Sequence, residues 1–173
     1  MHINSRWTMS LEARTVIEIL RLEPLQPEGG FFREMYRSKS FVSVAGASRA
    51  LATSIYYMMT KDSFSAFHRL KSDEVYHFYC GSPVELLLIH PSGELQEIVL
   101  GSDIVGGQIP QYAAPAGVWQ AARVKSESPS AWSLLGTTVS PGFDFEDFEL
   151  GGRQLLDALG PNHRTLVRSL TED

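Results

Sequence analysis

The sequence predicts a mainly β protein, a sandwich or barrel of short strands with a short helix near each end. Three observations lead to this prediction. Short apolar runs recur at even spacing, turn residues such as Gly and Pro separate them, and helical patterns stand before and after them. The 173 residues are 43% hydrophobic and 20% charged, which is ordinary for a packed globular domain.

The first expected element is a helix over about residues 10–22. Apolar residues recur there at helical spacing, and Ser10 is available as the N-cap. Pro24 and Pro27 end the helix, because proline cannot continue one. The next run, Phe31–Arg37, alternates well enough to form a strand.

A series of further short runs supplies the other strands. The breaks between them carry turn chemistry, for example Gly81-Ser82-Pro83 and Gly106-Gly107. The expected strands are Ala52–Met59, Ser65–Leu70, Val75–Cys80, Val84–His90, Leu95–Leu100, Gln111–Pro115, Val118–Val124 and Ser133–Val139.

The C-terminal part begins with an acidic, aromatic stretch, Phe143–Glu149. We interpret it as an edge segment with its Phe side chains inward and its acids in water. A second helical pattern follows over about residues 153–170 and is expected to pack as an end cap. No internal repeat or linker divides the sequence, so we predict a single domain over residues 1–173, with its strands between about residues 31 and 150.

Composition excludes several classes of partner. The net charge is −5 with scattered Lys and Arg, so no basic surface for nucleic acid is expected. Cys80 is the only cysteine, which excludes an internal disulfide, and its apolar neighbours predict a buried thiol. Neither a signal peptide at residues 1–10 nor a run of bilayer-spanning length is present, so we expect a cytoplasmic protein with no membrane partner.

Two spaced motifs indicate the chemistry. The spacing H-x-L-x3-E-x6-G begins at His68, and P-x-G-x2-Q begins at Pro115. These motifs resemble the two metal-binding motifs of the cupin superfamily, with Leu70 and Gln120 standing where that family has its second and third histidines. The matching positions are His68, Glu74, Gly81, Pro115 and Gly117. The flanking glycines and the asparagine of the family pattern are replaced by Asp62, Ile109 and Val124.

A closer resemblance covers nearly the whole chain. The sequence is similar to a subfamily of small single-domain RmlC-like cupins whose activity is generally unassigned. That resemblance implies a jelly-roll β-barrel with a cavity, flanked by short terminal helices, and a homodimer. The residues that carry it are residues 27–34 (PEGGFFRE), 67–69 (FHR), 73–77 (DEVYH), 115–120 (PAGVWQ) and 141–145 (PGFDF).

Strand alternation brings three polar side chains together. His68 shares a face with Ala66 and Leu70, and Glu74 shares a face with Tyr76. If these faces point into the barrel, His68 and Glu74 meet there, and Gln120 reaches the same pocket. The alternative is that His68 and Glu74 form a buried, hydrogen-bonded pair that only stabilises the barrel. On the opposite faces, His77 and Trp119 are expected to be packing or interface residues.

We therefore predict His68, Glu74 and Tyr76 as catalytic residues. Further residues are predicted to bind the ligand, with Gln111 near the pocket rim; this set is Arg33, Glu34, Tyr36, Gln111 and Gln120. Alternation of Arg33 and Arg37 with Glu34 and Tyr36 leaves open which set faces inward. An inward Arg would suit a carboxylate or a phosphate.

The leading hypothesis is a cupin that binds a small polar metabolite, as an epimerase or isomerase of a carbohydrate- or nucleotide-like substrate. His68 would be the general base, and Glu74 or Tyr76 would position the substrate or protonate it. One alternative is a metal-dependent oxygenase or hydrolase that holds a divalent metal through His68, Glu74 and Gln120. Another is a binding protein without catalysis. No cofactor is otherwise expected, and the small molecule and a second copy of the chain are the expected partners.

Overall fold

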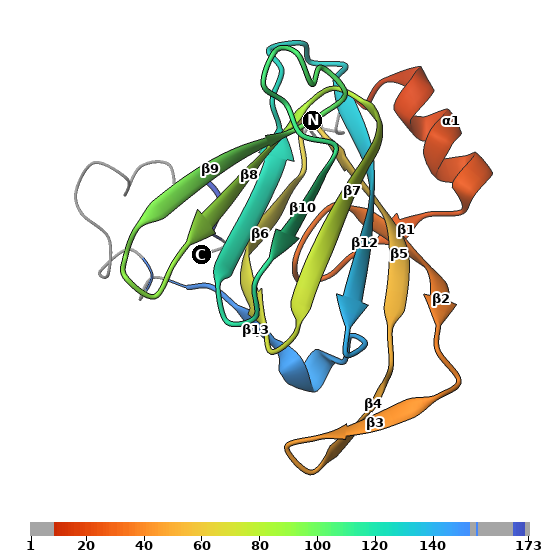
Figure 1. Ribbon diagram of the computed structural model, residues 1–173. Helices are drawn as coiled ribbons and strands as arrows, with labels where there is room; N and C mark the ends of the chain where they lie inside the picture. Colours follow the sequence, from red (N-terminus) through yellow and green to blue (C-terminus); the bar gives the residue numbers. More distant parts are fainter. Residues whose placement is uncertain (1–8, 153–154, 156–167, 172–173) are drawn as a thin grey trace, which may run out of the picture.

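The computed structural model describes residues 9–152, 155 and 168–171 (Figure 1). In this part of the chain one α-helix precedes a series of antiparallel strands. The elements are α1 (Leu11–Leu20), β1 (Glu23–Pro24), β2 (Phe31–Arg37), β3 (Phe41–Val44), β4 (Ala47–Ala50), β5 (Thr53–Thr60), β6 (Phe64–Leu70), β7 (Asp73–Gly81), β8 (Val84–Ile89), β9 (Leu95–Leu100), β10 (Gln111–Ala114), β11 (Trp119–Val124), β12 (Trp132–Ser140), the 3-10 turn η1 (Phe145–Asp147) and β13 (Phe148–Leu150).

Two antiparallel sheets face each other in a jelly-roll arrangement (Figure 1). One has the order β1-β2-β5-β12-β7-β10 and the other β13-β6-β11-β8-β9. The mainly β jelly-roll prediction is confirmed. The hydrogen-bonded ladders do not close into one continuous barrel, so the expected barrel is a sandwich of two sheets, and the core and the cavity lie between them.

The core explains why β8 reads as an unbroken apolar run. Leu86 and Leu88 face the other sheet and join the main core. Leu87 and Ile89 point the opposite way, where they are covered by a second cluster that includes Leu155 and Leu170. A strand buried on both faces has no polar face to present, so its sequence does not alternate. Each fully buried Leu stabilises the fold by about 1.5–3 kcal/mol.

The N-terminal helix forms where the sequence predicts it. The Ser10 hydroxyl accepts a hydrogen bond from the Ala13 amide at 3.1 Å, which is the expected N-cap. The helix ends at Leu20, two residues earlier than the expected boundary, because Arg21 adopts a left-handed conformation and caps it. Ala13 and Leu22 pack with Met58 and Leu134 on the outer side of the first sheet.

All the expected strands are present with small shifts at their ends, but β1, β3 and β4 were not predicted, and β13 begins in the stretch that was predicted only as an edge segment. The β3–β4 hairpin projects from the body of the fold (Figure 1). It has little core to face, so Phe41 and Val44 are exposed, and its turn at Ala45 and Gly46 uses two positive φ angles. The short strands β1 and β13 lie at the edges of the two sheets, where pairing rather than apolar periodicity defines them.

The prediction of a buried Cys80 thiol is wrong, because Cys80 is exposed. Strand β7 pairs Phe78 with Leu135 and Cys80 with Leu134, so Tyr79 is an extra residue in the ladder. Such a β-bulge reverses the alternation of the residues that follow it. Glu74 and Tyr76 keep the inward face, whereas Cys80 is turned outward.

Most of the predicted C-terminal helical segment, residues 153–170, lies outside the described residues. Of its described members, Leu155 and Leu170 are buried against Phe67 and Ala121 on the outer face of the second sheet. Among the helices that the structure describes, none has the length and apolar character needed to cross a bilayer.

Candidate functional site

A cavity of about 330 Å³ lies between the two sheets. Apolar and aromatic side chains line much of its wall, and titratable groups occupy its floor and its mouth. The lining residues are Leu25, Gln26, Pro27, Glu28, Phe32, Glu34, Arg37, Thr53, Ile55, Tyr57, His68, Leu70, Glu74, Tyr76, Thr137, Val139, Phe143, Asp144, Phe145 and Phe148. This volume is at the lower end of the range of small-molecule sites, about 300–1,000 Å³.

His68 lies at the floor of this cavity, with only 2% of its surface exposed. An irregularity in β6 pairs Ser65 with Ala122 and His68 with Gln120, which places both Ser65 and His68 on the inward face. The His68 Nδ1 atom lies 2.8 Å from the Ala66 carbonyl oxygen. Because a carbonyl can only accept, Nδ1 carries a proton and donates it there.

Two carboxylates flank the His68 imidazole on its two nitrogens. Glu28 Oε1 lies 3.9 Å from Nδ1, and Glu74 Oε2 lies 3.8 Å from Nε2. Burial by itself lowers the pKa of His68, but the charges of Glu28 and Glu74 outweigh it and raise that pKa to about 9. The structure therefore brings the predicted pair His68 and Glu74 together.

Glu28 is the member of this group that strand alternation did not identify as a site residue. It lies in the turn before β2, where its backbone carbonyl accepts from the Ala66 amide at 2.8 Å. The Ser65 hydroxyl donates to its Oε1 at 2.7 Å, and burial raises the pKa of the Glu28 carboxyl. The available signal was the PEGG run itself. A Cβ atom on Gly29 would collide with the Phe64 carbonyl, so this turn can pack against β6 only with glycine there.

Gln120 packs behind His68 and Glu74 and is 2% exposed. Its Nε2 donates to Glu74 Oε2 at 2.6 Å and lies 3.1 Å from His68 Nε2. In this orientation His68 Nε2 must accept, which fits a neutral imidazole, and Gln120 Oε1 is buried without a hydrogen-bond partner. When His68 is protonated, a half-turn of the amide offers Oε1 as the acceptor for Nε2–H.

Two buried tyrosines complete the floor. Tyr76, a predicted catalytic residue, lines the cavity and is 1% exposed. Tyr57 donates from its hydroxyl to the Gly29 carbonyl at 3.0 Å. Burial, together with the nearby charges of Glu28 and Glu74, raises the pKa of both phenols well above the ordinary value. They are therefore hydrogen-bond donors near neutral pH, not bases.

The mouth of the cavity carries the pair Glu34 and Arg37. Strand β2 pairs Glu34 with Ile55 and Tyr36 with Ser54, so Met35 is an extra residue. This bulge brings positions 34 and 37 to the same side, and both line the cavity. The Arg37 Nη2 atom lies 2.7 Å from Glu34 Oε2, and Nη1 donates to the Phe143 carbonyl at 3.2 Å.

Three predicted ligand-binding residues lie away from the cavity. Arg33 donates to the Leu20 carbonyl at the end of α1, at 3.1 Å. Tyr36 is 55% exposed, and Gln111 is an exposed residue of the edge strand β10 that pairs with His77. Arg33 and Tyr36 lie away from the cavity because only one face of β2 meets it. The bulge between Glu34 and Tyr36 changes which residues lie on that face. His77 points to the outer side and lies 3.2 Å from the Thr138 hydroxyl.

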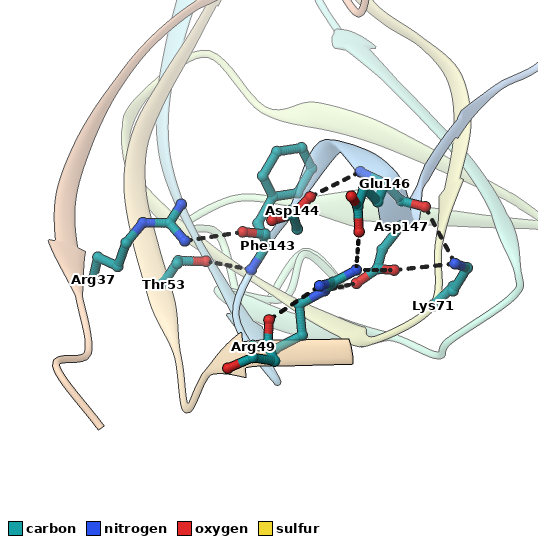
Figure 2. Close-up of polar contacts among 9 residues, drawn as sticks. Arg37, Arg49, Thr53, Lys71, Phe143, Asp144, Glu146 and Asp147 are labelled. Carbon is teal, nitrogen blue, oxygen red and sulfur yellow. Dashed lines mark hydrogen bonds and ion pairs between the residues drawn. The ribbon is translucent and has the colours of Figure 1, made fainter. Parts of the chain in front are cut away.

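The segment Phe143–Phe148, here called the strap, forms one wall of the cavity and is anchored from β4, from β5 and from the turn after β6 (Figure 2). Thr53 Oγ1 accepts from the Phe143 amide at 2.9 Å. Arg49, 8% exposed, donates to Asp147 Oδ2 at 2.6 Å and to Glu146 Oε2 at 3.0 Å (Figure 2). Lys71 adds an ion pair to Asp147 at 3.1 Å.

The predicted orientation of this segment holds for its aromatic residues and fails for one acid. Phe143, Phe145 and Phe148 line the cavity, although Phe145 is also 61% exposed at the mouth. Asp147 is not in open water, because its side chain is only 13% exposed and is paired with Arg49. The sequence could not show this pair, since Arg49 comes from the hairpin that was not predicted.

The donor set does not fit a metal ion. In the described part of the chain, no three His, Cys, Asp or Glu side chains gather around one point. Glu28 and Glu74 approach opposite nitrogens of His68, and the Gln120 amide occupies the side where Nε2 and Glu74 converge. One imidazole, one carboxylate and one amide fall short of the two histidines and one carboxylate that iron oxygenases use.

Comparison with known proteins places this geometry in a family. Residues 14–151 match the sequence model of a family described as Cupin superfamily (DUF985). The uncharacterized protein YML079W of Saccharomyces cerevisiae is 32% identical over 149 residues, which are 78% of this chain and 74% of that protein.

Solved structures show the same likeness. Protein SO0799 from Shewanella oneidensis is 37% identical, with a TM-score of 0.83 over 92% of this chain and 97% of that chain. A hypothetical protein from Leishmania major is 31% identical, with a TM-score of 0.84 over 93% and 99% of the two chains. Oxalate decarboxylase from Bacillus subtilis is 12% identical with a TM-score of 0.54 over 87% of this chain and 35% of that chain, a likeness of fold alone.

Proposed function

Because the chain belongs to the DUF985 family of the cupin superfamily, we propose that it binds a small polar metabolite between its sheets and acts on it as a non-oxidative epimerase or isomerase. The proposed substrate is a carbohydrate- or nucleotide-like molecule, as in the sequence analysis. The observation that carries the proposal is the row Glu28, His68 and Glu74 at the floor of a 330 Å³ cavity.

This row supports acid–base chemistry. An epimerase removes a proton from a carbon beside a carbonyl and returns one to the opposite face, so it needs groups that both accept and donate protons. Glu28 is 15% exposed in its side chain, and its raised pKa brings a carboxyl group closer to neutral pH. Both nitrogens of His68 already have partners, so His68 acts through its charge, which lies between Glu28 and Glu74 and influences their affinity for a proton, rather than by direct attack.

The phenols and the strap support the same reaction. Tyr76 keeps its proton near neutral pH, so it can donate a hydrogen bond to the oxygen on which negative charge develops. The aromatic side chains of the strap line one wall of the cavity with apolar surface. The expected roles are therefore Glu28 as acid–base group, His68 as the charged group between Glu28 and Glu74, Glu74 as the second carboxylate beside His68, and Tyr76 as oxyanion donor.

Solvent isotope exchange tests this function. The full chain, purified without added ligand, is denatured and its bound small molecules are identified by mass spectrometry. The identified metabolite is then incubated with fresh protein in heavy water, and we expect deuterium to enter one carbon position, as seen by NMR. His68→Asn should slow this exchange by roughly a hundredfold or more, whereas the control His90→Asn, at a turn outside the cavity lining, should not.

Two results would count against the proposal. A metabolite that binds but never exchanges a proton would make the protein a binding module without catalysis. Exchange that persists at full rate in His68→Asn would remove His68 from the mechanism.

A further inference from the structure

The charged groups around the cavity are unequally distributed. Among the described residues that line it, the carboxylates outnumber the cationic groups, which are Arg37 and His68. The carboxylates are Glu28, Glu34, Glu74 and Asp144. A ligand that enters therefore meets more negative than positive charge.

Arg37 already holds a carboxylate, because the forked side of its guanidinium is paired with Glu34. Its Nε donates to Glu34 Oε1 at 3.1 Å and its Nη2 donates to Glu34 Oε2 at 2.7 Å. Its Nη1 donates to the Phe143 carbonyl at 3.2 Å. Each guanidinium nitrogen is therefore already engaged, and the forked donor surface that recognises carboxylates and phosphates is occupied.

The floor of the cavity stabilises positive charge. His68 is almost completely buried, and burial alone would disfavour its protonated form. Glu28 and Glu74 reverse this effect, since the pKa of His68 is raised to about 9. Even with His68 protonated, its one positive charge faces two carboxylates, so the floor keeps a net negative charge that favours a cation bound beside it over an anion.

The wall that adjoins the floor is aromatic. Phe143 and Phe145 contact each other edge to face, with ring centroids 5.1 Å apart, and Phe148 lies 6.3 Å from each. Phe148 also stacks on His68 at 5.4 Å, which joins the aromatic wall to the acidic floor. Ring faces attract cations and accommodate apolar groups.

We propose that the cavity selects a small organic cation, a protonated amine carried on an apolar or aromatic body, and discriminates against carboxylates and phosphates. The inference rests on the proposed binding of a metabolite in this cavity and narrows its class. The ammonium group lies near Glu28 and Glu74, and the body of the ligand lies against Phe143, Phe145 and Phe148. Within the proposed substrate class it favours an amine-bearing metabolite over a phosphorylated one.

Three probes of one shape but different charge test the selection. Benzylamine, benzyl alcohol and benzoate share a ring and carry a positive, a neutral and a negative group near neutral pH. Calorimetric titration of the full chain should show benzylamine binding about tenfold or more tightly than benzyl alcohol, the effect of one charge-assisted hydrogen bond. Benzoate should bind more weakly than benzyl alcohol.

A charge-neutralising variant locates the effect. Glu28→Gln should lower the ratio of the benzylamine affinity to the benzyl alcohol affinity from about tenfold or more to about one. The matched control is Glu94→Gln, which removes the same charge at an exposed turn and should leave the preference unchanged. If Glu28→Gln fails to fold, the three probes on the unaltered chain still test the selection by charge.

The outcomes separate this inference from the proposed function. Benzoate or benzyl alcohol binding as tightly as benzylamine would overturn selection by charge and leave a metabolite pocket in place. Failure of all three probes to bind at their solubility limits would also overturn it. The isotope-exchange experiment judges the proposed reaction separately, with the ligand that the protein itself retains.

Discussion

His68 and Glu28 face each other at the floor of the cavity, with Nδ1 and Oε1 3.9 Å apart, although they come from different segments of the chain. Glu74 lies at the opposite nitrogen at 3.8 Å. A protonated imidazole between two carboxylates stabilises the folded state. A neutral imidazole leaves the two negative charges without a positive charge between them. Stability should therefore depend on pH through this residue.

The first prediction concerns that pH dependence. The pKa of His68 is about 9 in the folded chain, above the ordinary value of 6.5, so its contribution is complete below about pH 6.5 and is lost as the pH rises through about 9. The lost free energy of unfolding should be on the order of 1–3 kcal/mol. Melting curves measured across this window should show a falling midpoint for the unaltered chain.

Substitution isolates the contribution of His68. His68→Asn should be less stable than the unaltered chain near neutral pH and should lose most of the decline between about pH 6.5 and 9. The control His90→Asn should keep the decline of stability over this pH range. Identical pH profiles for the unaltered chain and His68→Asn would show that this imidazole is not protonated in the folded state.

The second prediction concerns metal binding. Gln120 Nε2 lies 3.1 Å from His68 Nε2 and 2.6 Å from Glu74 Oε2, so a side chain at position 120 reaches both. Gln120→His should supply a second imidazole beside His68 and Glu74, and a divalent metal such as zinc or nickel should then bind. Metal content after dialysis should rise toward one ion per chain, compared with the unaltered chain treated in parallel. An unchanged content would show that the donors cannot converge.

The third prediction concerns the strap. Arg49 Nε donates to Asp147 Oδ2 at 2.6 Å and ties the β3–β4 hairpin to η1 (Figure 2). Arg49→Met should remove this link and leave the Asp147 side chain, which is 13% exposed, paired with Lys71 alone. Amide hydrogen exchange over residues 143–148 should therefore accelerate by about tenfold or more. Lys71→Met, which changes a lysine side chain 70% exposed, is the control and should have a smaller effect. Equal exchange in both variants would contradict an Arg49 anchor.

The fourth prediction is a homodimer, which we propose on both the family resemblance and the surface of β2. Beyond Phe32, no strand in the described part of the chain pairs with the outer edge of β2. Met35, Tyr36 and Phe41 are exposed by 46%, 55% and 65%, and an unpaired edge beside apolar side chains favours pairing with a second copy.

Light scattering at micromolar concentration should give twice the mass of one chain. Tyr36→Glu should shift this mass toward that of a monomer. Ile104→Glu, at an exposed loop position away from β2, should not. A monomeric unaltered chain would remove the proposal.

Local sequence was sufficient for the strands and for part of the site. Alternation predicted that Glu74 and Tyr76 share a face and that Gln120 reaches His68, and the structure brings these side chains together. This success has a simple cause, because pleating fixes the face of each residue wherever a ladder is regular. The two motif spacings added the family and its jelly-roll fold.

Tertiary structure decided the rest. Bulges at Met35 and Tyr79 reverse the alternation, which is why Arg37 rather than Tyr36 lines the cavity and why Cys80 is exposed. Glu28 belongs to no strand, and only the packing of its turn against β6 brings it to His68. Periodicity describes neighbours within one strand, whereas a bulge depends on the partner strand and a buried ion pair depends on segments that meet only when the two sheets pack.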